Sequence, residues 1–325
     1  MLELTRLGFG GAPLGNLFTA VAEDDARRAV DAAYAAGIRY FDTAPLYGHG
    51  LSERRLGEAL RGRPRASFVL STKVGRVLEP GRAERSAYVD VPPCAPRFDY
   101  SYDGALRSVE ASLRRLGLDR ADILLIHDID AFTHGPDGRE ARFREAMAGA
   151  YRALAELRGA GTVRAIGVGV NEWEICQRCL EAADFDCFLL AGRYSLLEQA
   201  PLDSFLPLCV RRGIGVVIGG PFNSGILATG AVPGARYDYK PAPPAILERA
   251  RRLERVCASH DVPLAAAALQ FPLFHPAVAS VIPGARSAAE VEQNVALLDH
   301  PIPPALWRDL KAEGLVRPDA PTPGE

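Results

Sequence analysis

The sequence predicts an α/β protein, with residues 1–325 forming a single (β/α)8 TIM barrel domain. Short apolar runs alternate with segments of helical periodicity in eight successive units. Each apolar run is nearly continuous, which is typical of parallel strands that are buried on both faces. The order of the units never switches, so closure into a barrel is favoured over an open sheet. A chain of 325 residues is a usual length for one such domain.

The elements follow from periodicity taken along the chain. Strands are expected at residues 7–11, 38–41, 68–73, 122–126, 163–170, 185–191, 214–218 and 279–282. Helices are expected at residues 23–36, 102–116, 143–158, 172–183, 204–212, 244–260, 264–271 and 287–298, with an extra helix near the C-terminus. A further helix is expected to begin after the second strand, with Ser52 as its N-cap.

Local signals mark the ends of several elements. Gly37 and Gly117 follow two predicted helices, and glycine often ends a helix because it adopts the left-handed conformation freely. Residues 128–142 are interpreted as a polar loop over the end of the fourth strand. Residues 318–325 are expected to form a frayed tail.

The stretch from 75 to 100 follows the third strand and is interpreted as an irregular insertion. It contains four prolines and is too long for an ordinary loop. Because it also carries Tyr88, Val91 and Phe98, it is expected to be a lid or part of the substrate pocket rather than disordered.

Composition bounds the class of partner. The net charge of −2 and the isoelectric point near 6.3 indicate neither a nucleic-acid nor a membrane-surface binder. No run of eighteen apolar residues and no secretory leader are found, so a cytoplasmic location is expected. Cys176 and Cys179 are expected to be neighbours on one helix rather than ligands, and no metal is expected.

Titratable side chains follow three successive predicted strands. Asp42 and Tyr47 follow the second strand, Lys73 ends the third, and His127 ends the fourth. Each alone is more simply a turn cap, a half-buried aromatic, a surface lysine or a core histidine. Because the carboxyl ends of barrel strands meet at one face, the four are expected to share one pocket suited to proton transfer.

These residues, in this order, resemble the catalytic tetrad of the aldo-keto reductase superfamily. The matching segments are Phe41-Asp42-Thr43-Ala44 with Tyr47-Gly48, Ser71-Thr72-Lys73 and Leu125-Ile126-His127. The resemblance implies hydride transfer between a nicotinamide cofactor and a carbonyl or alcohol. Tyr47 would transfer the proton, and Lys73 would lower the pKa of that phenol from its usual value of about 10. Asp42 would hold Lys73, and His127 would orient the substrate oxygen.

The resemblance also implies a cofactor site. Asn171 would bind the nicotinamide amide, although Val170 stands where the family usually has serine. The chain carries no Rossmann fingerprint, because Pro13 occupies the place of its third glycine. The other predicted cofactor contacts are Gly11, Pro221, Phe222, Asn223, Ser224, Gly225, Leu227, Gly284, Arg286, Gln293 and Asn294.

NAD is expected in preference to NADP. Many NADPH-preferring relatives carry lysine at the position of Gly284 and arginine at that of Glu290. A carboxylate about 5 Å from the 2′-phosphate would cost roughly 3 kcal/mol at an effective dielectric near 20. Arg286 would offset part of that cost. Since cells usually keep NAD oxidised, a dehydrogenase is expected.

Residues 190–197, 220–227 and 306–321 resemble the branch that contains L-fucose and D-threo-aldose 1-dehydrogenases and a pyridoxal 4-dehydrogenase. The expected reaction is oxidation of a sugar's anomeric hydroxyl to the lactone. The alternatives are oxidation of pyridoxal to 4-pyridoxolactone and, from another class, a non-catalytic cofactor-binding regulatory module. A polar pocket would favour the sugar, whereas an aromatic one, built from Phe18, Trp173 or Phe222, would favour pyridoxal.

Overall fold

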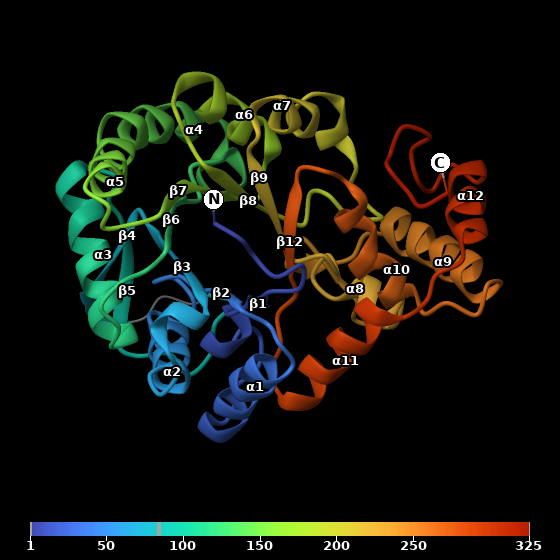
Figure 1. Cartoon of the computed structure of the whole chain (residues 1–325), viewed down its shortest axis with the longest axis horizontal. Helices are drawn as coiled ribbons and strands as arrows, with labels where there is room; N and C mark the ends of the chain where they lie inside the picture. The colour runs from blue at the N-terminus through green and yellow to red at the C-terminus, as the bar shows by residue number, and fades with distance from the viewer. Residues whose placement is uncertain (1, 83–85, 325) are drawn as a thin grey trace.

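The computed structural model of the chain describes residues 2–82 and 86–324. Its largest sheet has eight strands, all paired in parallel. They are, in order, β1 (Phe9–Gly10), β2 (Tyr40–Asp42), β3 (Val69–Val74), β6 (Ile123–His127), β7 (Ala165–Val170), β8 (Cys187–Ala191), β9 (Gly215–Gly219) and β12 (Val278–Ile282). Helices surround the strands (Figure 1), so the predicted (β/α)8 barrel is confirmed.

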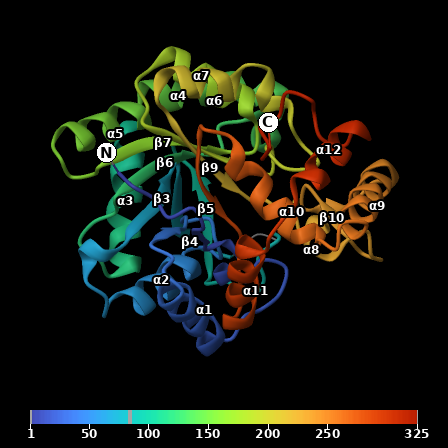
Figure 2. The same ribbon diagram turned by 45° about the vertical axis from the view of Figure 1, so that its right-hand side comes forward.

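The barrel closes where β1 meets β12, a contact that we call the seam. Gly8 N–H donates to the Val281 carbonyl at 2.8 Å, and Gly10 N–H donates to the Pro283 carbonyl at 3.1 Å. A Cβ added at Gly10 would lie 2.8 Å from the Ile282 carbonyl oxygen, so the close approach requires glycine there. Helices from the two ends of the chain, α1 (Glu23–Ala35) and α11 (Ala288–Asp299), lie side by side across the seam (Figures 1 and 2).

Helices form the outer layer around the sheet. Besides α1 and α11 it contains α2 (Leu51–Leu60), α3 (Tyr102–Leu116), α4 (Ala131–Ala148), α5 (Ala150–Gly159), α6 (Trp173–Ala182), α7 (Phe205–Arg212), α8 (Ile226–Thr229), α9 (Pro244–Ala258), α10 (Leu264–Gln270) and α12 (Pro304–Ala312). In α3 the Ser101 hydroxyl accepts from Gly104 N–H, and Gly117 ends the helix with a φ of 61°. The predicted extra C-terminal helix is α12.

Alternate side chains of the strands divide the core into two parts. One set packs between the strands and the helices, with Phe41, Leu70 and Leu124 as members. The other set fills the barrel interior and contains Tyr40, Val69, Ile123, Leu125, Ala165, Leu189, Val217 and Ile282. The barrel interior is therefore packed with side chains, and the buried Asp42, Lys73 and His127 lie toward the carboxyl ends of the strands.

Two predictions made near strand ends are wrong. Ser52 does not cap α2, because the helix begins at Leu51 after Gly50, and the Ser52 hydroxyl instead donates to the Gly11 carbonyl at 2.7 Å. Residues 128–142 are not a loop, because α4 covers most of them. The side chain of Asp130 caps this helix by accepting from Thr133 N–H at 3.1 Å.

The insertion and the tail are more ordered than expected. Residues 75–100 contain an antiparallel hairpin of β4 (Arg76–Pro80) and β5 (Cys94–Phe98), while residues 83–85 lie outside the described part. In the predicted frayed tail, Ala320 is fully buried and its N–H bonds the Arg317 carbonyl, so the chain packs on the barrel at least that far. Residue 325 is not described.

Some properties concern the described residues as a whole. Within residues 2–82 and 86–324, no helix combines the length and the apolar character needed to cross a bilayer. Over the same ranges, no group of three or more histidine, cysteine or acidic side chains is arranged to hold a metal. Cys176 and Cys179 are both buried on α6, as neighbours on one helix.

Candidate active site

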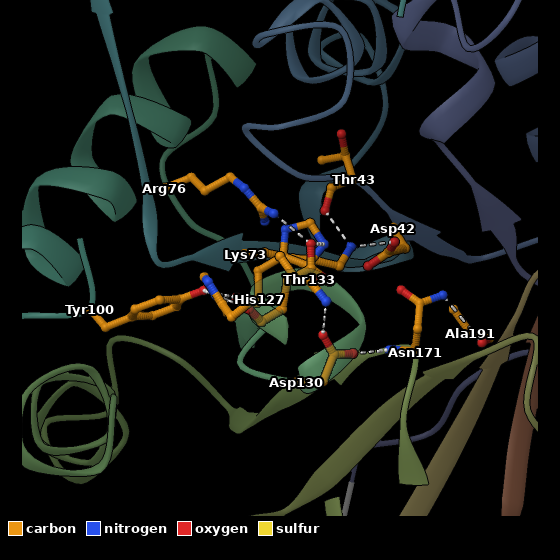
Figure 3. Close-up of polar contacts among 12 residues, drawn as sticks. Asp42, Thr43, Lys73, Arg76, Tyr100, His127, Asp130, Thr133, Asn171 and Ala191 are labelled. Carbon is orange, nitrogen blue, oxygen red and sulfur yellow. Dashed lines mark hydrogen bonds and ion pairs between the residues drawn. The ribbon is translucent and has the colours of Figure 1, made fainter. Parts of the chain in front are cut away.

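A buried ion pair lies at the ends of β2 and β3. Lys73 Nζ donates to Asp42 Oδ2 at 2.7 Å and to the Thr43 carbonyl at 2.8 Å (Figure 3). The Ser71 hydroxyl donates to the other carboxylate oxygen of Asp42 at 2.6 Å. The two charged side chains expose only 1% and 2% of their surface. Charges this deeply buried are tolerated only when paired and hydrogen-bonded, and this pair is.

The phenol and the imidazole meet above this pair. Lys73 Nζ lies 4.6 Å from the centre of the Tyr47 ring. The rings of Tyr47 and His127 are 5.9 Å apart, centre to centre, and nearly perpendicular at 84°. A Cβ added at Gly169 would lie 3.3 Å from Lys73 Cε, so glycine on β7 gives the lysine room. The structure therefore brings all four side chains of the predicted tetrad together.

The pKa of Tyr47 is shifted in the direction opposite to the one expected. Burial raises it well above the usual range, and the charges of Asp42 and Asp128 and the phenols of Tyr88 and Tyr239 raise it further. The Lys73 ammonium is itself paired with the Asp42 carboxylate, which offsets its charge. The phenol of the chain alone is therefore neutral at physiological pH.

His127 is also neutral. Burial lowers its pKa well below the usual value, and the positive charges of Arg76 and Lys73 add to that effect. Its Nε2 lies 3.5 Å from Asp128 Oδ2, and its Nδ1 is buried without a hydrogen-bond partner among the described residues. The Tyr100 hydroxyl bonds the carbonyls of His127 and Asp128 at 2.8 and 2.7 Å, which fixes this strand end.

A cavity of about 580 Å³ opens in front of Asp42 and Tyr47. This volume lies within the range of small-molecule sites. The predicted cofactor and substrate residues that line it are Gly11, Phe18, Asn171, Pro221, Phe222, Asn223, Ser224, Gly225, Gly284, Arg286, Gln293 and Asn294. Lys73 and His127 are not among its lining residues.

Two predicted residues lie elsewhere. Leu227 is fully buried in the core beneath the cavity wall and does not line the cavity. Trp173 borders a separate depression of about 380 Å³, together with Arg139, Arg193 and Glu198. Trp173 therefore does not line the cavity in front of Tyr47, where it was expected.

The glycine-rich segment after β9 forms a backbone cradle. Asn223 and Ser224 have φ values of 45° and 59°, and Gly225 has a φ of 101°. A Cβ added at Gly225 would meet no atom within 4 Å. The Asn223 amide donates to the Gly192 carbonyl at 2.9 Å, which anchors the turn. Exposed backbone of this kind allows a phosphate-bearing ligand to approach closely.

An ion pair closes the opposite part of the cavity wall. The Arg286 side chain donates from Nε and Nη2 to Glu290 Oε1 at 3.0 and 2.6 Å. The backbone N–H of Arg286 donates to Glu290 Oε2 at 2.7 Å. The carboxylate raises the pKa of the guanidinium. The charge of Arg286 is therefore already compensated within the protein.

Sequence reasoning missed a second wall, the hairpin of β10 (Arg236–Tyr237) and β11 (Lys240–Pro241). Asp238 and Tyr239 lie at its tip and line the cavity. Arg193 grips the Asp238 carboxylate with two hydrogen bonds of 2.7 and 3.0 Å. The alternation of charged and aromatic residues between Gly234 and Pro241 is the signal that could have found this hairpin.

The fold and the site together define a class of protein. A (β/α)8 barrel with a buried lysine–carboxylate pair, a phenol and a neutral imidazole at its strand ends is suited to transfer a proton to or from a small molecule in the adjoining cavity. A model of the aldo/keto reductase family matches residues 6–313. The chain belongs to the aldo/keto reductase family.

Two curated relatives are similar over nearly their whole length. Pyridoxal 4-dehydrogenase of Microbacterium luteolum is 46% identical, with 97% of this chain and 95% of the relative covered. D-threo-aldose 1-dehydrogenase of a Pseudomonas species is 41% identical, with 99% and 96% covered. A solved aldo-keto reductase from Bacillus halodurans, in its holo form, has a TM-score of 0.71 at 29% identity, with 97% and 93% covered. The chain is thus an NAD(P)-dependent oxidoreductase that acts on alcohol groups of small molecules.

The residues present fit the nicotinamide cofactor that the family implies. The cradle at Gly225 offers backbone to phosphates, and Asn171, which lines the cavity with Tyr47, offers an amide near the proton-transfer group. Asn171 N–H is held by Asp130 at 2.7 Å (Figure 3), so its position is fixed by the same residue that caps α4. When bound, the cofactor supplies the hydride acceptor or donor.

Proposed function

We propose that the chain is an NAD-dependent dehydrogenase that oxidises the hydroxyl group of a cyclic hemiacetal to the lactone. One observation carries the proposal: the Tyr47 phenol and the neutral His127 ring converge over the buried Asp42–Lys73 pair, beside one cavity. A lactone is what remains when a hemiacetal carbon loses its hydrogen as hydride and its hydroxyl loses a proton.

The chain's own residues handle the proton. The substrate hydroxyl gives its proton to the Tyr47 oxygen, which accepts it only as phenolate. Lys73, held by Asp42, places its ammonium 4.6 Å from the centre of the Tyr47 ring. His127 is neutral and presents an imidazole nitrogen to the substrate oxygen, which aligns the hydroxyl for transfer.

The acidic residue at the cofactor wall supports NAD over NADP. Glu290 lines the cavity and already binds Arg286, so a 2′-phosphate placed there would meet a carboxylate rather than a free guanidinium. Glu290→Gln should lower the ratio of kcat/KM for NAD to that for NADP by about 10- to 100-fold. Glu292→Gln, an exposed carboxylate on the same helix, is the control. An unchanged ratio would contradict the assignment.

The cavity wall favours pyridoxal, which reverses the order expected from the sequence. Four aromatic side chains line the cavity: Phe18, Tyr47, Phe222 and Tyr239. A planar aromatic hemiacetal gains about 0.5–1.5 kcal/mol from each well-placed ring contact. The similarity to the Microbacterium pyridoxal 4-dehydrogenase supports the same substrate.

A sugar is the second candidate. Arg76 and Asp128 form a buried charged pair beside His127, and ionised side chains are good partners for sugar hydroxyls. The similarity to the Pseudomonas D-threo-aldose 1-dehydrogenase supports this candidate, in which the anomeric hydroxyl is oxidised.

The test is NADH formation from NAD, and NADPH formation from NADP, with pyridoxal, L-fucose, D-arabinose and L-galactose. Reduction of NAD by pyridoxal that disappears in Tyr47→Phe is the expected result. Turnover of sugars alone would favour the second candidate. No turnover with any compound, while NADH still binds, would overturn the proposal in favour of a non-catalytic binder.

A further inference from the structure

Arg76 and Asp128 form an ion pair that the proton-transfer steps do not use. Arg76 opens β4, the first strand of the insertion, and Asp128 directly follows His127. Arg76 Nη2 lies 2.7 Å from Asp128 Oδ2, and the side chains expose 7% and 12% of their surface (Figure 3 shows Arg76 beside His127). The pair is therefore almost as secluded as the one between Asp42 and Lys73.

Asp128 is held in an unusual backbone conformation. Its φ is 53°, in the left-handed region that non-glycine residues seldom occupy. Two donors fix its carbonyl: the Tyr100 hydroxyl at 2.7 Å and His134 Nε2 at 2.8 Å. Strain of this kind persists where the surroundings fix it, and it gathers at functional sites. The result is a carboxylate 3.5 Å from His127 Nε2.

Asp128 lies next to the reacting groups, although it does not itself line the cavity. Its Oδ2 is 3.5 Å from His127 Nε2, and the His127 ring is 5.9 Å from the Tyr47 ring. The charge of Asp128 raises the pKa of Tyr47 and that of Tyr88, whose rings are 6.3 Å apart. It also acts on Tyr239, which lines the cavity. Of these three phenols, Tyr47 and Tyr239 line the cavity. The carboxylate therefore acts on two residues of the cavity wall and lies beside the imidazole that orients the substrate, where it can meet a neighbouring group of that substrate.

Stability alone does not explain the pair. A buried ion pair is often no better for folding than apolar side chains of the same size, because removing both charges from water is costly. Here the cost is greater, since Arg76 Nη1 is buried with no acceptor among the described residues. The guanidinium also rests on the Phe98 ring at 4.6 Å, so its position is fixed from behind.

We propose that Asp128 is a specificity-determining residue that accepts a hydrogen bond from a second donor group of the substrate, next to the hemiacetal hydroxyl that is oxidised. Arg76 is its positioning residue. The inference rests on the proposed function and deepens it, because it restricts the substrate to hemiacetals that carry a further donor. For an aldose the donor is the neighbouring hydroxyl, and for pyridoxal it is a ring hydroxyl or the protonated ring nitrogen.

The charges around Asp128 decide when it is ionised. Burial raises its pKa, Asp130 raises it further, and Arg76 and Lys73 oppose that rise. His127 is neutral and adds no charge. Removing the guanidinium should therefore move the ionisation of Asp128 to higher pH, and the recognition of the donor should be lost at the acid side first.

The experiment compares matched pairs of substrates that differ in the donor. One pair is pyridoxal and 2-(hydroxymethyl)benzaldehyde, which forms the same ring without nitrogen or hydroxyl. The other is D-arabinose and its 2-deoxy form. Asp128→Asn keeps the shape and tolerates the left-handed backbone. It should reduce the ratio of kcat/KM within a pair by about 10- to 100-fold, through KM rather than kcat. Asp119→Asn, on an exposed carboxylate, is the control.

Arg76 is tested by rescue. Arg76→Met should lower the same ratio and shift the acid limb of its pH profile upward, whereas Arg76→Lys, which still pairs with Asp128, should restore both. Arg97→Lys, on the opposite strand of the hairpin, is the control. A loss of the same size for both members of each pair would overturn the proposal.

Binding of the lactone products to the enzyme with NADH separates this inference from the proposed function. Wild-type enzyme should bind 4-pyridoxolactone more tightly than phthalide, the lactone without the donor groups, and Asp128→Asn should remove the difference. Discrimination between the lactones without turnover would contradict the proposed function alone. Turnover without discrimination would contradict the role of Asp128 alone.

Discussion

The reacting groups and the cavity wall are held in two different ways. Asp42 and Lys73 project from neighbouring strands, expose almost no surface, and are fixed by hydrogen bonds that the sheet itself provides. Tyr239 stands at the tip of a hairpin, 41% exposed, and both it and Phe18 have left-handed backbones with φ values of 63° and 64°. The buried ion pair of the reacting groups is thus held by the sheet, whereas the aromatic residues of the cavity wall are held by loops.

This contrast has a measurable form. Substitutions of the Asp42–Lys73 pair should change kcat or the free energy of unfolding, because both side chains are buried and paired. Substitutions in the wall should change KM and leave the fold nearly as stable, because exposed contacts contribute little to folding. Four experiments examine the contrast, from the largest expected effect to the smallest.

Tyr47→Phe removes the oxygen that exchanges the proton and leaves the ring. We expect kcat to fall by about 10²- to 10⁴-fold, the usual contribution of a positioned acid or base. Cofactor binding, measured by fluorescence titration with NADH, should stay within about twofold, since the aromatic contact is kept. A substantial residual kcat would assign the proton transfer to another group. Tyr47 would then belong to the cavity wall rather than to the reacting groups.

Lys73→Met leaves the Asp42 carboxylate buried without its partner. The free energy of unfolding should fall by about 3–5 kcal/mol, as measured by denaturant titration, because an unpaired buried charge is strongly destabilising. The double variant Asp42→Leu with Lys73→Met should recover much of that loss while remaining inactive. If Lys73→Met were as stable as the wild type, the pairing of Asp42 with Lys73 would not be needed to keep the buried carboxylate in the fold.

The pH dependence of oxidation tests the neutral phenol. Because the pKa of Tyr47 is raised, the phenolate that accepts the proton becomes scarcer as pH falls. The rate should therefore increase by about tenfold per pH unit across the neutral range. Tyr88→Phe removes one of the groups that raise this pKa, and it should move the profile to lower pH. A flat profile would mean that the hydroxyl loses its proton elsewhere.

Arg193→Met frees the hairpin that carries Asp238 and Tyr239. The pair is partly exposed, so the free energy of unfolding should change by about 1 kcal/mol or less. The dissociation constant for NADH, measured by titration, should rise by several-fold, because the hairpin borders the cavity. Arg178→Met, which breaks an exposed pair with Glu140 on the outer face, is the control. Equal effects of the two variants would remove any special role for the hairpin.

The sequence predicts the first of the two regions well and the second poorly. Apolar runs that end in Asp42, Lys73 and His127 can be recognised along the chain, and parallel strands must bring their ends to one face. Asp128 follows His127 at the same strand end and could have been included on that ground alone. Its partner Arg76 could not, because the pairing depends on how the insertion folds back.

Misjudged segments share a physical cause. The predictions of Ser52 as an N-cap and of residues 128–142 as a loop rest on local preference, whereas tertiary contacts decide both positions. The Ser52 hydroxyl is drawn to the Gly11 carbonyl, and the Asp130 side chain both caps α4 and holds Asn171. Helix α4 also changes direction at Gly135, whose φ of 70° interrupts the pattern on which a helix prediction relies.

The seam gives the cavity a further consequence. Gly10 from the first strand and Gly284 from just beyond the last both line the cavity, and each lies beside a backbone bond that closes the ring. A cofactor in that cavity would contact the first strand and the residues after the last strand together. It would therefore stabilise the closed barrel. Opening of the ring must then release the ligand first, so amide hydrogens of Gly8, Gly10 and Val281 should exchange with solvent more slowly as the cofactor concentration rises.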